Sequence, residues 1–441
     1  RASKLAGRTS AGLQRSNKAM SLIARDKRCI WHPYTQHATE ADPLEVATAK
    51  DSVLTLADGT ELIDGISSWW ATLHGHAHPK IVSAFAQQAA TLDHVLFAGA
   101  THEPAVRLAE RLIEKAPKGL SRVFFSDNGS TAVEVAIKMA RQVWCHRGEE
   151  QRDVFLCLDG AYHGDTFGAM AVGDPDPFFL PFTPMLFSAK RVAADSDAVQ
   201  KALKQLGNRC AGVILEPLIQ GAAGMLMQTV EFVQQVRALC DEHGVPMIAD
   251  EVMTGFGRTG ELFACGKAGV TPDLLCLAKG LTGGSFPLSA TLTTEAYFEA
   301  FLSPERIRAF FHGHTFTGNP IGCAVALASL DICEEELTPA RLDSIGSRIE
   351  DNLRARLAGQ CHVQKLRRTG GVVAFDLVPS GTAGSGYLSE LQPMLRAAAI
   401  ERGVLLRPLG NVLYALPPAS TTFDQCDQIS SAMCEMAELV R

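Results

Sequence analysis

The feature that most constrains the fold is a repeated succession of short apolar segments and helical segments in the middle of the chain. Between two of the apolar segments, residues 130–144 place Val133, Ile137, Ala140 and Trp144 at helical spacing. Apolar strands that do not alternate with polar residues, and that helices separate, indicate a largely parallel sheet covered on both faces. The sequence therefore predicts an α/β fold. The apolar segments are RVFFSD (122–127), DVFLCLDG (153–160), AGVILEPL (211–218), VPMIADEV (245–252) and DLLCLA (273–278).

The pattern changes toward the C-terminus, where a charged helical stretch at 340–357 is followed by the apolar segment 370–378 and two more helical stretches. This predicts a smaller α+β domain. Residues 53–65 resemble a β-hairpin with a type I′ turn at Asp58-Gly59, and this hairpin could pack with the C-terminal segments. We therefore expect a large domain at 67–335 and a small domain built from 20–66 and 336–441.

Residues 1–19 are basic and contain no acidic residue, as in a transit-peptide remnant or a leader added for expression. We exclude them from the fold and expect them to be disordered.

The composition excludes several classes of partner. The formal charge of -7 argues against nucleic acid, and no apolar run approaches the roughly 20 residues that span a bilayer. Cys157, Cys276 and Cys323 lie in apolar segments, and no C-x-x-C pair occurs among the 12 cysteines. This usage is typical of buried free thiols in a reducing compartment. We expect a cytoplasmic protein, or one of an organellar matrix if residues 1–19 are a transit-peptide remnant.

One lysine stands where an apolar strand ends. In LLCLAKGLTGGSFPL (274–288), Lys279 follows the apolar run and glycines come directly after it. Burial lowers the pKa of a lysine, so that its amine can act as a neutral nucleophile toward a carbonyl. Pyridoxal phosphate (PLP) is the commonest cofactor that needs such a lysine. Taken alone, a lysine in this position would more often be a surface lysine in a turn.

Three further stretches supply what a PLP site needs. Asp250 ends a strand expected to run parallel to the strand before Lys279, and its carboxylate could keep the pyridine nitrogen protonated. Gly129 and Ser130 open a helix, where backbone N–H groups favour a phosphate. Tyr162 in GAYHGDTFGAM could stack on the ring. Each residue alone could be a cap or an ordinary loop residue, but together they indicate a PLP site.

With these motifs in this order, the chain resembles the class III aminotransferases of the fold-type I PLP enzymes. The resemblance covers most of the chain and implies a large domain with a mainly parallel sheet, a smaller α+β domain, PLP as cofactor and a homodimer with shared active sites. The matching motifs are SDNGSTAVEVAIKMAR, AYHGDTFGAM, ILEP, IADEVMTGFGRTG, LAKGLTGG and HGHTFTGNPIGCAVALASL.

The resemblance also implies roles for single residues. Lys279 would bind the cofactor as a Schiff base and, once released, move protons during catalysis. Thr315 would hold the phosphate of the other subunit's cofactor, so that two chains complete each site. The residues implied to contact the cofactor are Gly129, Ser130, Tyr162, Asp250, Lys279, His314 and Thr315. The residues implied to contact substrate are Tyr34, Trp69, Tyr162, Lys279, Gly313, Arg407 and Tyr414.

Two stretches, IWHPYTQ (30–36) and GISSWWATLHGHAHP (65–79), resemble the members of the class that act in biotin synthesis. This implies transfer of an amino group from S-adenosylmethionine to 8-amino-7-oxononanoate by ping-pong half-reactions, with Arg407 binding the carboxylate. The alternatives are lysine as donor, or an ω-amino acid transaminase of the ornithine or 4-aminobutyrate type. A binding module that has lost its chemistry is disfavoured, because Lys279, Asp250 and Arg407 occur together.

One position departs from the family pattern. The family commonly has proline where this chain has His314 in HGHTF, next to Thr315, which leaves the cofactor affinity and the donor open. The histidines of HGHAH (74–78), with His312 and His314, could suggest a metal, but their spacing fits no zinc site. We expect loop histidines around the mouth of the active site and no metal.

Overall fold

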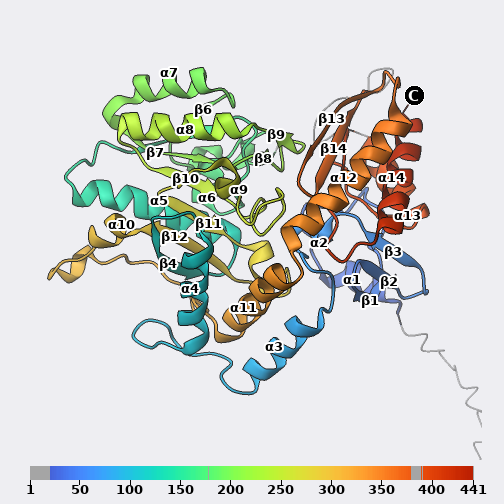
Figure 1. The fold of residues 1–441 in the computed structure, drawn as a ribbon, viewed down its shortest axis with the longest axis horizontal. Coiled ribbons are helices and arrows are strands. Elements are labelled where there is room, and N and C mark those ends of the chain that lie inside the picture. Colours follow the sequence, from blue (N-terminus) through green and yellow to red (C-terminus); the bar gives the residue numbers. More distant parts are fainter. Residues whose placement is uncertain (1–19, 177, 379–388, 390, 441) are drawn as a thin grey trace, which may run out of the picture.

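The computed structural model describes residues 20–176, 178–378, 389 and 391–440. A seven-stranded sheet lies at the centre of the larger part (Figure 1). Strand β12 runs antiparallel to both of its neighbours, and the other six strands are parallel to one another. The predicted α/β class with a mainly parallel sheet is confirmed. In order across the sheet, the strands are β4 (Leu120–Ser126), β12 (Ser289–Thr294), β11 (Leu274–Leu277), β10 (Met247–Asp250), β7 (Cys210–Leu215), β5 (Val154–Leu158) and β6 (Ala189–Val192).

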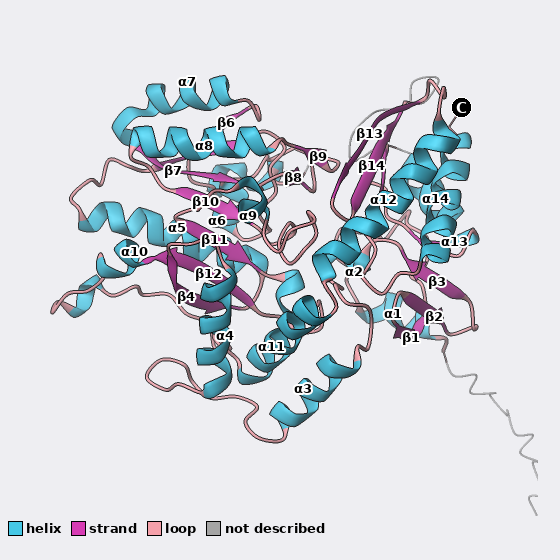
Figure 2. Ribbon diagram, viewed as in Figure 1, coloured by secondary structure: helices cyan, strands magenta, loops and turns pink. Residues whose placement is uncertain are grey.

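Helices cover both faces of this sheet (Figure 2). In β11, Leu274 and Cys276 join the core under α5, whereas Leu275 and Leu277 join the core on the opposite face. Because both faces of the strand are buried, its sequence is apolar throughout and shows no alternation. The helices packed on or around the sheet are α3 (Pro79–Ala89), α4 (Glu103–Lys115), α5 (Gly129–His146), α6 (Phe167–Ala171), α7 (Ser196–Leu206), α8 (Val230–His243), α9 (Ala264–Ala268), α10 (Glu295–Glu299) and α11 (Pro320–Glu335).

Segments from the two ends of the chain form a second part, blue and orange to red at the right of Figure 1. Strand β3 (Glu61–Asp64) pairs with β2 (Val53–Leu56) in the predicted hairpin and, in parallel, with β15 (Val404–Leu405). The type I′ turn is wrong, because only Gly59 among residues 57–60 has a positive φ and such a turn requires two. The hairpin of the N-terminal segment thus lies against the C-terminal one.

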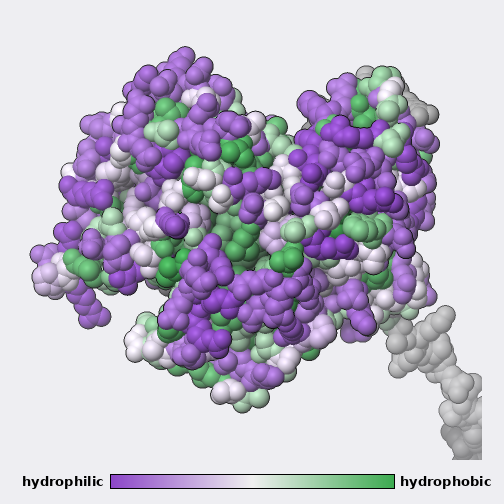
Figure 3. Space-filling model, in the orientation of Figure 1, coloured by the Kyte–Doolittle hydropathy of each residue, from purple (hydrophilic) through white to green (hydrophobic). Residues whose placement is uncertain are grey.

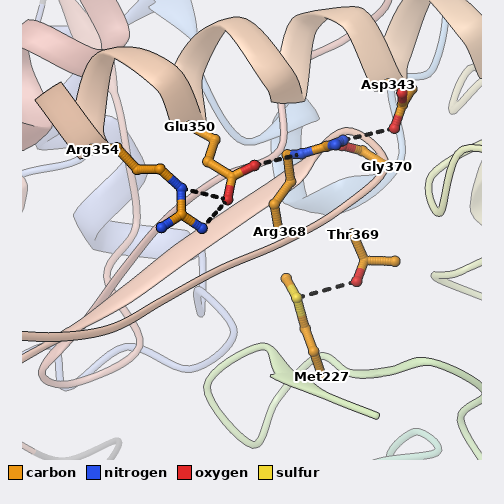
Figure 4. A network of polar contacts seen from close by, with 7 residues as sticks. All are labelled: Met227, Asp343, Glu350, Arg354, Arg368, Thr369 and Gly370. Atoms are coloured by element: carbon orange, nitrogen blue, oxygen red, sulfur yellow. Dashed lines mark hydrogen bonds and ion pairs between the residues drawn. The ribbon is translucent and has the colours of Figure 1, made fainter. Parts of the chain in front are cut away.

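A three-stranded sheet, which begins with β13 (Val363–Thr369), belongs to the same part and is packed against α12 (Thr338–Leu357). Arg368 on β13 donates to Asp343 and Glu350 of that helix (Figure 4). Gly346 of α12 lies so close to Gly370 that a Cβ would collide with the Gly370 carbonyl. The other elements of this part are α1 (Leu22–Cys29), β1 (Val46–Lys50), α2 (Ser67–Trp70), β13 (Val363–Thr369), β14 (Val372–Leu377), α13 (Leu391–Glu401), β16 (Val412–Ala415) and α14 (Phe423–Glu438).

A hydrogen bond links the two parts of the molecule. Thr369 of β13 hydrogen-bonds through its hydroxyl to the sulfur of Met227 in the short strand β9 (Leu226–Met227), which pairs with β8 (Ile219–Gln220) (Figure 4). On the face drawn in Figure 3, hydrophilic residues cover the helices, and apolar residues show mainly in the middle. In the described ranges, every helix is too short or too polar to cross a membrane.

Some predictions lie outside these observations. Residues 1–19 fall outside the described residues, and the domain limits at 66 and 335 stay predictions. The described cysteines are all free thiols, and Cys157, Cys276 and Cys323 are buried as expected.

Candidate active site

A cavity of about 780 Å³ opens at the carboxyl ends of β10 and β11, beside the first turn of α5. Residues from both parts of the molecule line it, which is typical of ligand sites in open α/β sheets. The structure brings nine of the predicted site residues to this one cavity. They are Tyr34, Trp69, Gly129, Ser130, Tyr162, Asp250, Lys279, Arg407 and Tyr414.

Asp250 is the last residue of β10 and pairs with Cys276 of the parallel neighbour β11, and Lys279 lies two residues after the end of β11. Lys279 begins a 3₁₀ turn (Lys279–Thr282) with a φ of 46°, a left-handed value that strains a residue with a side chain. Its Nζ lies 4.6 Å from the centroid of the Trp70 ring. Burial lowers the pKa of Lys279 to about 8, although the charge of Asp250 acts in the opposite direction. Part of the lysine population is therefore a neutral nucleophile near neutral pH.

Asp250 is held by the loop that follows β5. Its Oδ2 accepts from Nδ1 of His163 at 2.7 Å, and its Oδ1 accepts from the Val252 N–H at 3.0 Å. Burial lowers the pKa of His163, but the hydrogen bond and charge of Asp250 outweigh this and raise it overall. The ring of His163 thus has a specific partner in the carboxylate of Asp250.

The first turn of α5 forms an anion cradle. Asn128 caps the helix by accepting from the Thr131 N–H, while the described residues supply no acceptor for the N–H groups of Gly129 and Ser130. A Cβ at Gly164 would collide with Ser130, so only glycine lets this loop approach the helix. Free N–H groups at a helix N-terminus favour a phosphate.

Tyr162 and Tyr34 meet at the cavity although they are far apart in sequence. The Tyr34 hydroxyl donates to Asp165 at 2.7 Å and lies 3.1 Å from the Tyr162 hydroxyl. The Tyr162 N–H donates to Glu216, whose pKa burial raises to about 7. Burial also raises the pKa of Tyr162, so its phenol group stays neutral at the cavity.

The other side of the cavity is aromatic and carries one cation. The guanidinium carbon of Arg407 lies 4.4 Å from the Trp69 ring centroid. The Trp70 indole N–H donates to the Tyr414 hydroxyl at 2.9 Å. An apolar slot that contains an arginine suits a chain that ends in a carboxylate.

Three predicted residues do not line the cavity of their own chain: Gly313, His314 and Thr315. The His314 ring lies 3.1 Å from His312 and 3.4 Å from Asp127. The resemblance already places this loop at the site of another subunit, so the roles of these three residues stay predictions. In the described part of the chain, no three His, Cys, Asp or Glu side chains form a group that could hold a metal ion.

The structure adds residues that the sequence did not single out. Trp70, Asn128, Asp165 and Glu216 also line the cavity. Glu216 lies in the ILEP motif and Trp70 is adjacent to Trp69, so both could have been examined from the sequence. Asn128 could have been predicted as the helix cap.

These residues fit PLP. The cavity offers a lysine with a lowered pKa, a buried carboxylate for a pyridine nitrogen and unsatisfied N–H groups for a phosphate. A fold-type I arrangement with this set of groups defines a PLP-dependent transferase.

The comparison with protein families agrees. The model of the family "Aminotransferase class-III" matches residues 34–436. The chain belongs to the class-III aminotransferases, which confirms the predicted family, and it is a PLP-dependent aminotransferase.

The most similar relatives carry a single enzyme name. The chain is 49% identical to an adenosylmethionine-8-amino-7-oxononanoate aminotransferase of Synechococcus elongatus, over 93% of this chain and 98% of the relative. It is 41% identical to the protein of that name in Geobacter sulfurreducens, over 91% and 94% of the two chains. A solved structure of the same enzyme from Methanocaldococcus jannaschii superposes with a TM-score of 0.90, at 35% identity, over 95% and 99% of the chains.

A second solved structure extends the comparison. It is an amine transaminase of an uncultivated Pseudomonas species in a PLP-bound form, with a TM-score of 0.84 at 32% identity, over 93% of this chain and 99% of that one.

Proposed function

We propose that the protein transfers an amino group from S-adenosylmethionine to 8-amino-7-oxononanoate, giving 7,8-diaminononanoate for biotin synthesis. The observation that carries the proposal is that Lys279 and Arg407 line the same aromatic cavity. Lys279 can act at the reacting carbon of the substrate while Arg407 binds the carboxylate at its far end. The names of the relatives support the choice of substrates.

The chain's own residues have these roles in the proposal. Gly129 and Ser130 hold the phosphate of PLP, Asp250 pairs with its pyridine nitrogen, and Tyr162 stacks on its ring. When bound, PLP draws electrons from the carbon that carries the amino group and so makes its proton acidic. The Nζ of Lys279 would move this proton between the substrate carbon that carries the amino group and the C4′ carbon of the cofactor. Its lowered pKa suits a group that must be neutral in one step and charged in the next.

The substrate side binds two unlike molecules in turn. The keto acid is a long apolar chain with a carboxylate, and Arg407 binds this carboxylate while Tyr34, Trp69 and Tyr414 line the chain. The sulfonium and adenine of the donor suit the same aromatic faces.

A homodimer completes the site in this proposal. Thr315 reaches the phosphate of the other subunit's cofactor, with Gly313 and His314 alongside. The free thiols fit a reducing compartment, and we place the reaction in the cytoplasm.

A donor screen on the yellow holoenzyme tests the function. S-adenosylmethionine should bleach the visible absorbance band, and 8-amino-7-oxononanoate should restore it. If lysine bleaches the band and S-adenosylmethionine does not, the donor in the proposal is wrong but the keto substrate is unaffected. Bleaching only by ornithine or 4-aminobutyrate would overturn the assignment to biotin synthesis.

The variant Arg407→Ala separates the two substrates. It should weaken binding of the keto acid far more than it slows bleaching by the sulfonium donor. Equal losses for both substrates would contradict the role of Arg407.

A further inference from the structure

The two tryptophans at the cavity lie on an unusual piece of backbone. Residues 67–70, which form α2, have φ values of 51°, 45°, 75° and 69°, although none of them is glycine. The ψ values of Ser68 and Trp69 are 53° and 48°, so the segment is one turn of left-handed helix. L-residues visit this region singly and at a cost, and a run of four needs compensating contacts.

Several of the compensating contacts are made by Asp64, the last residue of β3, which is 0% exposed. Another is made by the Ser67 hydroxyl, which donates to the Leu416 carbonyl at 2.8 Å. The Asp64 carboxylate accepts from both the backbone N–H and the hydroxyl of Ser68, at 2.9 and 2.7 Å. It also accepts from Nε2 of His76 at 2.9 Å. Burial raises the pKa of Asp64, but these hydrogen bonds outweigh it and lower the pKa overall. Asp64 is thus an ionised, buried acceptor at the centre of the strained turn.

The same residue joins the turn to the segment that carries Arg407. Asp64 pairs with Leu405 across β3 and β15, two residues before Arg407. The Gly65 N–H donates to the Leu405 carbonyl at 3.1 Å, and a Cβ at Gly65 would lie 2.7 Å from Leu406. The turn follows β3 and Arg407 follows β15, so both come after strands that pair with each other. The guanidinium of Arg407 lies over the Trp69 ring.

The neighbouring residue, Trp70, is fixed by a hydrogen bond of its own side chain. The Trp70 indole N–H donates to Tyr414 and its ring contacts Lys279, whereas the Trp69 ring has an edge contact with Tyr34 and a contact with Arg407, neither of which is a hydrogen bond. Loss of the turn should therefore displace Trp69 more than Trp70.

We propose that Asp64 is a positioning residue, which by accepting from Ser68 and His76 holds the left-handed turn 67–70 and so places Trp69 against Arg407. The inference rests on the proposed function, because Trp69 and Arg407 are assigned there to the substrate. Asp64 itself does not line the cavity.

Steady-state kinetics of the holoenzyme with 8-amino-7-oxononanoate test the inference. Asp64→Ala should raise the KM about tenfold and leave kcat within about threefold, since uniform binding is lost and the chemistry is not. The pH titration of the visible absorbance band, which reports on Lys279, should stay unchanged. Asp273→Ala is the matched control: this carboxylate accepts from the Met247 N–H and Arg237 away from the cavity, so its loss should leave KM unchanged.

Two substitutions at Ser68 keep the test decisive if Asp64→Ala does not fold. Ser68→Ala and Ser68→Gly both remove the hydroxyl, but glycine adopts the left-handed conformation without strain. The KM should therefore rise more in the alanine variant than in the glycine variant. Equal KM values in both variants and the wild type would overturn the inference.

Arg407→Ala separates failure of the inference from failure of the function. A raised KM in Arg407→Ala with an unchanged KM in Asp64→Ala overturns the inference alone. An unchanged KM in Arg407→Ala overturns the proposed function of the site. Parallel changes in KM, kcat and the spectral titration of Asp64→Ala would mean a general structural role and would also overturn the inference.

Discussion

At the scale of single residues, the proposed role of Lys279 requires that its amine be neutral during part of the reaction. Burial lowers the pKa of Lys279 from 10.5 to about 8, while the carboxylates of Asp250 and Glu216 raise it. A buried amine that kept an ordinary pKa would be protonated at neutral pH and unreactive toward a carbonyl. The balance between burial and these carboxylates therefore sets the pH range in which the amine can react.

This balance predicts a pH profile for the apoenzyme. The rate at which an amine-selective reagent labels Lys279 should rise with pH through a midpoint of about 8, because the amine is neutral above its pKa. In Asp250→Asn the midpoint should be lower, since a charge that favours the ammonium form is removed. Asp165→Asn is the control and should leave the midpoint in place. An Asp250→Asn midpoint at or above that of the wild type would contradict the assignment.

Residues that end apolar strands could be predicted from the sequence, as Lys279 and Asp250 were. The contact between Asp250 and His163 could not, because it depends on the order of the strands, which places β5 two positions from β10. The left-handed turn at 67–70 was also missed, since no glycine or asparagine marks it.

At the scale of elements, a part-buried arginine contributes to the contact between α12 and β13. Arg368 has 24% of its side chain exposed and binds Asp343 and Glu350, whereas Arg354, with 60% exposed, binds the same Glu350 (Figure 4). The two arginines therefore share a partner but differ in burial.

The pair predicts a difference in stability. Arg368→Ala should lower the free energy of unfolding by about 1.5–3 kcal/mol, the range for hydrogen bonds to charged groups. Arg354→Ala should lower it by less than about 0.5 kcal/mol, because water screens an exposed ion pair. Urea unfolding measures both values, and equal losses would show that burial does not distinguish the two contacts.

The strands of the large sheet that are apolar on both faces could be predicted from the sequence, but strand β12 was missed. The segment SATLTT is rich in Ser and Thr, and it is buried only because it pairs between β4 and β11. Strand β15 has only two residues, too few for a pattern.

At the scale of the whole molecule, the site needs distant segments of the chain. Tyr34 and Arg407 come from opposite ends and meet at the cavity through the pairing of β3 with β15 and the contacts of Tyr34 with Asp165. Such long-range pairing leaves no local signal, so only the family resemblance could place these residues together. The domain limits and the shared dimer site remain predictions for the same reason.

Mixed dimers test the shared site. A chain with Lys279→Ala and a chain with Thr315→Ala should each be nearly inactive at low PLP. Coexpression should restore about a quarter of the wild-type activity, because half of the dimers are mixed and each of these has one intact site. Activity no higher than that of the separate variants would show that each chain builds its own site.

The central claim is that Lys279 is the residue that binds the aldehyde cofactor. Borohydride reduction of the holoenzyme, followed by peptide mapping, tests it most directly. We expect a pyridoxyl group on Lys279 alone, and none in Lys279→Ala. A pyridoxyl group on another lysine, or none on the wild-type protein, would contradict it.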